Sequence, residues 1–208
     1  MVSDFELLDA WAGGDREAGG QLFRRHFRAV FRFFGNKVGG GTEDLVQQTF
    51  LGCVETHTRF RRDAEFRTFL LSVARNVLYN EYRRRRRKDD RVDFLTHSVA
   101  DLAPSPTSIV ADKHEQRLLL EALRQIPLDY QIALELQLWE GLTGPQMAEV
   151  LDLAEPGVRS RLGRARKALR VRMEALAESP ALLKSTTADL EKWAHSLREA
   201  ALGGAPKG

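Results

Sequence analysis

The chain has 208 residues, of which 43% are hydrophobic and 29% are charged, enough for one large domain or two small ones. Its 32 Lys and Arg residues against 29 Asp and Glu residues leave a formal net charge of only +3, so the total charge indicates no polyanionic partner. The single cysteine, Cys53, excludes an internal disulfide framework, and the acidic N-terminus and lack of a long apolar run argue against secretion and membrane insertion. We therefore expect a cytoplasmic protein.

The first region, residues 1–91, is expected to form a compact helical domain. Apolar side chains recur there at three- and four-residue intervals, which is typical of amphipathic helices. One helix is predicted from about Glu17 to Val38, and three glycines at 39–41 break the chain after it. Two further helices are predicted around residues 46–57 and 66–78.

The end of the last of these helices is strongly basic. Six consecutive cations run from Arg83 to Lys88, and a block this dense usually marks a polyanion contact. Polar and aromatic side chains of the same helix are expected outside its main apolar stripe, and they are Arg75, Asn76, Tyr79, Asn80 and Tyr82. Aromatic rings interleaved with cations suit single-stranded DNA, because any base can stack on a ring while its phosphate pairs with a cation.

A short acidic stretch, residues 92–112, is predicted to be a flexible linker between two domains. Residues 93–112 hold three aspartates and no Lys or Arg. Pro104 and Pro106 lack amide donors, which argues against regular structure. The expected fold class is therefore all-α, with two small helical domains joined by this acidic linker.

The second region, residues 113–174, is predicted to contain a helix-turn-helix. Four helices are expected, at about 113–125, 129–140, 144–151 and 156–174. Thr143 and Gln146 have the spacing of a capping box at the start of the third helix. A short helix, a tight turn and a longer basic helix are the parts of a helix-turn-helix.

The last helix of this region carries seven basic residues and no acidic one between 157 and 172. Val158, Leu162, Ala165 and Leu169 form its expected buried face. At 100 degrees per residue, the polar side chains fall opposite or beside that face. This layout suits a helix that lies in the DNA major groove and holds phosphates at its edges. The residues expected to contact DNA are Arg159, Ser160, Arg161, Arg164, Arg166 and Lys167.

Three stretches together resemble bacterial RNA polymerase sigma factors of the extracytoplasmic-function (ECF) type. They are DLVQQTFL at 44–51, FRTFLLSVARNVLYNEYRRRRRK at 66–88 and LRQIPLDYQIALELQLWEGLTGPQMAEVLDLAEPGVRSRLGRARKAL at 123–169. The resemblance implies a first domain that binds core polymerase and the promoter -10 element, and a second that binds the -35 element.

The resemblance also assigns roles to individual residues. Asp44, Gln47 and Gln48 match the positions that dock on the polymerase clamp helices, although the family commonly has an acid where Gln48 stands. The remaining matches are to positions that hold the separated -10 strand, and they are Phe60, Arg61, Arg62, Asp63, Arg75, Asn76, Tyr79, Asn80, Arg83 and Arg84. Asn80 replaces a frequent Asp. The acidic linker resembles the segment that the family threads through the polymerase cleft.

The basic helix at about 156–174, which the resemblance assigns to the -35 element and which we call the -35 helix, departs most from the family pattern. Ala154 cannot cap it as a serine would, and Pro156 is expected to start the helix instead. Gly157 and Gly163 stand where the family often has side chains that could touch DNA. We therefore expect -35 reading here to involve more phosphate clamping than base readout.

The sequence offers no catalytic or cofactor chemistry. The five histidines are scattered without a metal-ligand pairing, so no metal, no cofactor and no enzymatic activity is expected. The expected partners are core RNA polymerase, promoter DNA that is duplex at -35 and single-stranded at -10, and an anti-sigma factor, in the cytoplasm at the nucleoid. The alternative is a free-standing helix-turn-helix regulator, which would need neither the polymerase-docking motif nor the -10 helix.

Residues 175–208 form a C-terminal extension of unknown role. Ser179 and Pro180 mark a break, and Leu190, Trp193 and Leu197 follow at helical spacing. This segment is expected either to fold back on the protein or to act as a docking or autoinhibitory helix.

Overall fold

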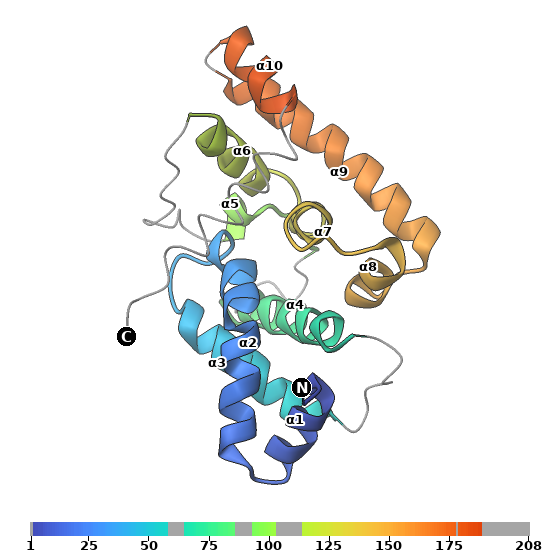
Figure 1. Ribbon diagram of the computed structural model, residues 1–208. Helices are drawn as coiled ribbons and strands as arrows, with labels where there is room; N and C mark the ends of the chain where they lie inside the picture. Colours follow the sequence, from blue (N-terminus) through green and yellow to red (C-terminus); the bar gives the residue numbers. More distant parts are fainter. Residues whose placement is uncertain (1, 58–64, 86–92, 103–113, 178, 189–208) are drawn as a thin grey trace.

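The computed structural model describes residues 2–57, 65–85, 93–102, 114–177 and 179–188, and its regular elements there are helices (Figure 1). One isolated β-bridge joins Ser98 and Pro127. The all-α prediction is therefore confirmed, and the second region contains the predicted helix-turn-helix.

Where the structure describes the first region, it forms α1 (Asp4–Ala12), α2 (Arg16–Gly35), α3 (Thr42–Thr56) and α4 (Phe66–Arg85). Local chemistry sets where they start. The Ser3 hydroxyl accepts a hydrogen bond from the Glu6 N–H at 3.2 Å, and Asp15 caps α2 in the same way. Gly41 precedes α3 with a φ of 73°, a left-handed conformation that favours glycine.

The second region follows a four-residue helix, α5 (Val99–Leu102). In the described residues its elements are α6 (His114–Arg124), α7 (Leu128–Leu138), α8 (Gly144–Leu151) and α9 (Glu155–Leu176), and α10 (Pro180–Ala188) follows in the C-terminal extension. The predicted cap at α8 is visible in the Gln146 side chain, which accepts a hydrogen bond from the Thr143 N–H at 2.8 Å. The -35 helix begins one residue before Pro156, at Glu155.

The two regions pack on each other through α4. One side of α4 contacts α2 and α3, and α8 packs against it from the second region (Figure 1). Leu22, Phe34, Phe50 and Leu70 are among the fully buried side chains of the first region. Burial of such side chains supplies most of the driving force for folding.

Part of the predicted linker is ordered, which corrects the expectation of irregular structure there. Phe94 and Val99 are buried, and the backbone carbonyls of Phe94 and His97 accept hydrogen bonds from the first turn of α7. Those N–H groups have no partner within the helix, and Pro127 offers no side-chain cap. The rest of the linker, residues 92 and 103–112, lies outside the described residues.

The C-terminal extension is described as far as residue 188. The predicted break is confirmed, since α9 ends at Leu176 and α10 begins at Pro180, and α10 lies against α6 and α9 (Figure 1). Leu190, Trp193 and Leu197 lie outside the described residues, so both expectations for them stay predictions. Within the described part of the chain, no helix is long and apolar enough to cross a membrane.

Candidate nucleic-acid interface

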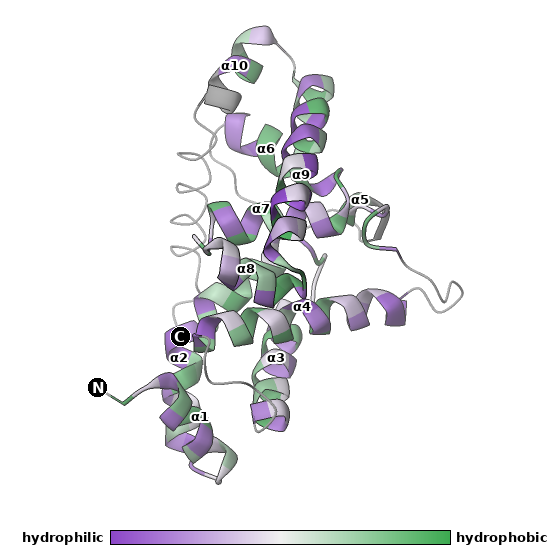
Figure 2. Cartoon of the chain, turned by 90° about the vertical axis from the view of Figure 1, so that its right-hand side faces the viewer, coloured by the Kyte–Doolittle hydropathy of each residue, from purple (hydrophilic) through white to green (hydrophobic). Residues whose placement is uncertain are grey.

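Helix α9 buries the predicted apolar face and exposes most of the predicted basic one. Val158, Leu162, Ala165 and Leu169 are all buried. The exposed residues of the predicted -35 set are Arg159, Ser160, Arg164, Arg166 and Lys167. Hydrophilic and hydrophobic residues alternate along α9 as expected for such a helix (Figure 2). This basic surface is open to a polyanion.

Arg161 is the exception. Its side chain is buried, and a guanidinium nitrogen lies 3.0 Å from a carboxylate oxygen of Asp129 in α7. The contact is an ion pair without the geometry of a directed hydrogen bond. The expectation that Arg161 is exposed beside the buried face of α9 is wrong. The helical period of the sequence does not reveal that α7 covers this position.

One face of α4 forms an open groove with α3. Asn76 and Asn80 are exposed, and they line a groove of about 650 Å³ together with Ser72 and with Gln48 of α3. Amide and hydroxyl groups both donate and accept hydrogen bonds, as the edges of unpaired bases require. The groove joins a residue predicted to bind polymerase with two predicted to bind DNA, which the sequence pattern did not reveal.

A second face of α4, next to the groove face, is covered. Tyr79 and Tyr82 are 7% and 0% exposed, so their expected position outside the main apolar stripe is wrong. The Tyr79 hydroxyl donates a hydrogen bond to Asp129 and accepts one from Arg75 at 2.9 Å. Burial and the nearby Asp129 carboxylate raise the pKa of Tyr79 above its ordinary value, so the phenol stays a donor.

The end of α4 is hydrophilic (Figure 2), and its basic side chains are partly neutralised within the helix. Arg84 donates two hydrogen bonds of 2.9 Å to Glu81, and Arg85 donates another of 2.6 Å. Arg83 is exposed, and its guanidinium lies 5.5 Å from the centre of the Phe94 ring. The cations at 86–88 lie outside the described residues, as do Phe60, Arg61, Arg62 and Asp63 of the predicted -10 loop.

The three residues predicted to bind polymerase share the outer face of α3. Asp44, Gln47 and Gln48 are all exposed. Beside them, Leu51 is 48% exposed, and with Phe23 it borders a second groove of about 360 Å³ that Gln47 also lines. The sequence analysis selected only polar residues on this face. It missed Leu51, an apolar residue one helical turn after Gln47 that stays half-exposed.

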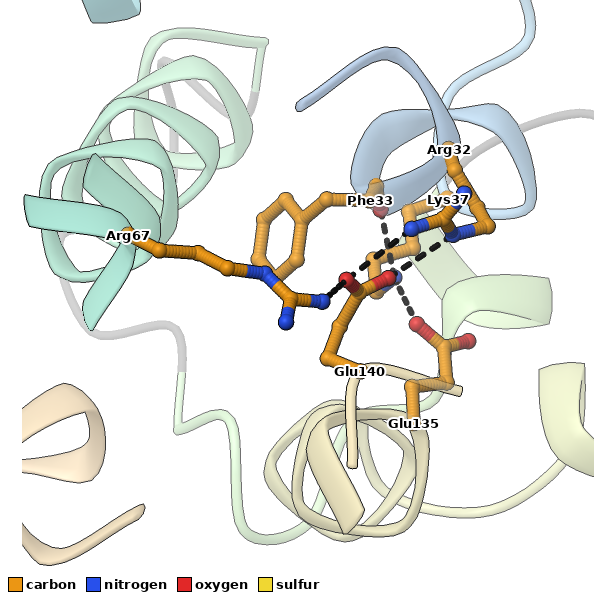
Figure 3. A network of polar contacts seen from close by, with 6 residues as sticks. All are labelled: Arg32, Phe33, Lys37, Arg67, Glu135 and Glu140. Carbon is orange, nitrogen blue, oxygen red and sulfur yellow. Dashed lines mark hydrogen bonds and ion pairs between the residues drawn. The ribbon is translucent and has the colours of Figure 1, made fainter. Parts of the chain in front are cut away.

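A buried charge network joins the two regions (Figure 3). Glu140, just after α7, accepts hydrogen bonds from Arg32 of α2 at 2.7 and 2.9 Å and a further one from Arg67 of α4. Burial alone would raise the pKa of Glu140, but the hydrogen bonds and charges of Arg32 and Arg67 outweigh it and lower the pKa.

Lys37, two residues after the end of α2, forms the second part of this network (Figure 3). It is fully buried, donates to the Phe33 carbonyl at 2.5 Å and pairs with Glu135 of α7. Gln131 donates another hydrogen bond to Glu135 at 2.8 Å. Burial raises the pKa of Glu135 despite the Lys37 ammonium group. Buried ion pairs fix an arrangement more than they stabilise it, because each charge loses its hydration.

The site holds no sign of metal chemistry in the described residues, where no three His, Cys, Asp or Glu side chains could share an ion. The arrangement is instead suited to polyanions, with an exposed basic helix in the second region and an amide-lined groove beside basic side chains in the first.

Two family models match the chain. Sigma-70 region 2 matches residues 22–88, and Sigma-70 region 4 matches residues 116–169. The two ranges together take in more than half of the chain.

Several curated sigma factors are similar to the chain in sequence. The ECF RNA polymerase sigma-E factor of Haemophilus influenzae is 24% identical over 185 residues, covering 85% of this chain and 98% of that protein. The ECF sigma factor SigX of Bacillus subtilis is 28% identical, covering 71% and 78%. A probable sigma factor, RfaY, of Xanthomonas campestris is 30% identical over 132 residues, but the match spans only 33% of that protein.

Solved structures share the fold. CnrH, in complex with the cytosolic domain of CnrY, has a TM-score of 0.59 at 23% identity and covers 85% of this chain and 100% of its own. The sigma factor RpoE of Bartonella quintana, in complex with the anti-sigma factor NepR, has a TM-score of 0.57 at 21% identity and covers 76% and 98%.

Proposed function

The chain belongs to the sigma-70 family and is a sigma factor of the ECF type, and from this premise we propose which of its surfaces bind core RNA polymerase and promoter DNA. The observation that carries the proposal is the presence, in one chain, of an exposed basic recognition helix and an amide-lined groove. A duplex-binding regulator needs only the first of these.

The -35 element is read by α9. Its exposed Arg159, Ser160 and Arg164 reach base edges, while the exposed Arg166 and Lys167 hold phosphates. Arg161 joins this surface only when its pair with Asp129 breaks.

The -10 element is read as a single strand along α4. Unstacked bases enter the groove beside Asn76 and Asn80, and Arg83 and Arg84 neutralise phosphates at the helix end. The -10 loop with Phe60, Arg61, Arg62 and Asp63 captures the flipped base. Holding separated bases offsets the few kcal/mol that unstacking costs.

The exposed face of α3 docks on core polymerase. The polar contacts come from Asp44, Gln47 and Gln48. The half-exposed Leu51 on the same helix supplies apolar contact area. As a sigma factor, the protein directs promoter choice and DNA opening in the cytoplasm, at the nucleoid, without a covalent step. An anti-sigma factor is a further partner, as it is for the RpoE protein of Bartonella quintana.

Reconstitution with core polymerase tests the proposal. We expect the chain to bind core enzyme and to retain a pre-opened promoter bubble more tightly than closed duplex. Asp44→Ala should weaken binding to core, while Glu43→Ala, a change at the neighbouring exposed acid, should not. An Asn76→Ala/Asn80→Ala double variant should lose bubble binding selectively.

The decisive contrary result is duplex binding by the chain alone together with no binding to core polymerase. That outcome would make the protein a free-standing helix-turn-helix regulator.

A further inference from the structure

The side chain of Phe94 covers Tyr79 on α4, the helix that we propose binds the -10 element and call the -10 helix. The Phe94 ring stacks on the Tyr79 ring with centroids 4.1 Å apart and planes 13° apart. The Arg83 guanidinium lies 5.5 Å from the centre of the Phe94 ring, and the Arg75 guanidinium lies 4.5 Å from that of Tyr79. Phe94 thus holds the position that a stacked base would take against Tyr79.

A carboxylate accompanies this ring. Asp129 accepts the Tyr79 hydrogen bond and pairs with Arg161 at 3.0 Å, so one anion engages a residue from each of the two predicted DNA-binding helices. The Asp129 N–H also donates to the Phe94 carbonyl at 3.0 Å, which ties the ring and the anion into one unit. The unit offers a stacked ring and a negative charge, the two features of a nucleotide that such surfaces recognise.

We propose that Phe94 and Asp129 form an internal ligand that occupies the Tyr79 side of the -10 helix in the free protein and must leave before single-stranded DNA can stack there. The inference rests on the proposed -10 function of α4. It goes further by assigning to the ordered part of the linker and to α7 the task of keeping this surface closed away from polymerase.

The physical consequence is a competition. DNA that needs the Tyr79 surface binds only the fraction of molecules in which the internal ligand has left, so its apparent affinity is reduced by that fraction. The Asn76 and Asn80 face lies on the open groove and is not subject to this competition. Removing the ring of Phe94 should therefore strengthen DNA binding by the free chain, which loss of a merely structural contact would not do.

The test measures binding of a short mixed-sequence single-stranded DNA to the full chain by fluorescence anisotropy, without polymerase. Phe94→Ala should raise the affinity at least about fivefold. Phe94→Leu, which keeps an apolar side chain but no aromatic face, should also raise it while costing less stability. Leu95→Ala is the matched control, because Leu95 is the next residue and is 42% exposed.

Adding Tyr79→Ala to Phe94→Ala should cancel the gain, because the gain passes through the uncovered Tyr79 ring. Unchanged or weaker DNA binding by both folded Phe94 variants overturns the proposal, as does an equal gain in Leu95→Ala. Circular dichroism establishes folding, and Phe94→Leu serves if Phe94→Ala does not fold.

The two proposals fail separately. If the wild-type chain with core polymerase does not retain a promoter bubble, the proposed function fails. If the holoenzyme retains it but the free Phe94 variants bind single-stranded DNA no better than wild type, only the internal ligand is refuted.

Discussion

The two helices proposed to bind DNA differ in how much of their binding surface is free. On α9, five of the six predicted residues are exposed and only Arg161 is buried against Asp129. On α4, Asn76 and Asn80 face an open groove, but Tyr79 is stacked on Phe94 and bonded to Asp129. If the proposed assignments hold, this arrangement leaves the duplex-binding surface mostly exposed and covers part of the surface proposed for single-stranded DNA.

The largest expected effect comes from breaking the interface that maintains this difference. Lys37→Met leaves the buried carboxylate of Glu135 without its cation, which typically costs about 3 to 5 kcal/mol. We expect the packed arrangement to lose that much stability in denaturant unfolding and α4 to become as accessible as α9. The double variant Lys37→Met/Glu135→Leu should recover most of the loss, because no buried charge then lacks a partner. A single variant as stable as wild type would contradict this view of the interface.

The next largest effects concern exposed basic residues of α9. Arg164→Ala should cost about 1 to 3 kcal/mol in binding -35 duplex and should relax base preference, without changing stability, since the side chain is exposed. Lys167→Ala should weaken binding equally for all sequences and reduce the salt dependence by about one ion. Titration of consensus and mutated -35 duplexes at several salt concentrations separates the two. If Arg164→Ala discriminates between the duplexes as wild type does, the assigned base contact is wrong.

A smaller effect concerns pH. The pKa of Glu140 is lower in the packed protein than in the unfolded chain, so its contribution is fully present above the ordinary glutamate range near 4.5 and is lost as pH falls through the lowered value. Protonation should cost less than the loss of Lys37, because a neutral carboxyl still accepts hydrogen bonds. Unfolding measured from neutral to acidic pH should show this loss in wild type, and Glu140→Gln should show a smaller decline. Identical pH profiles for the two proteins would refute the assignment.

The smallest effect is local to α9. Gly163 is exposed in the middle of the helix, and a Cβ there would meet open space. Gly163→Ala should therefore stabilise the protein by about 0.5 to 1 kcal/mol, because alanine is the better helix former. Thermal unfolding should show the gain, with packing of α4 unchanged. A loss of stability would mean that the helix needs glycine at this position for a reason other than space.

The sequence predicted the polar and apolar faces of α9 better than those of α4. The buried residues Val158, Leu162, Ala165 and Leu169 of α9 form a single stripe at helical spacing, so the helical period is enough to find it. Helix α4 is packed by α2, α3 and α8, and the Phe94 ring lies against Tyr79 and Tyr82. A helix covered on two sides has no single apolar stripe, and its buried Tyr79 and Tyr82 therefore looked like solvent-facing groups.

The features predicted correctly from the sequence depend on neighbours three or four positions away, such as the apolar stripe of α9, its basic face and the cap at Thr143. Which charges are buried depends on tertiary packing and could not be predicted from the sequence. Lys37 and Glu135 are 98 positions apart, and Arg32 and Glu140 are 108 apart. Such pairs leave no periodic signal, because the partner of each charge is selected by the packing of whole helices.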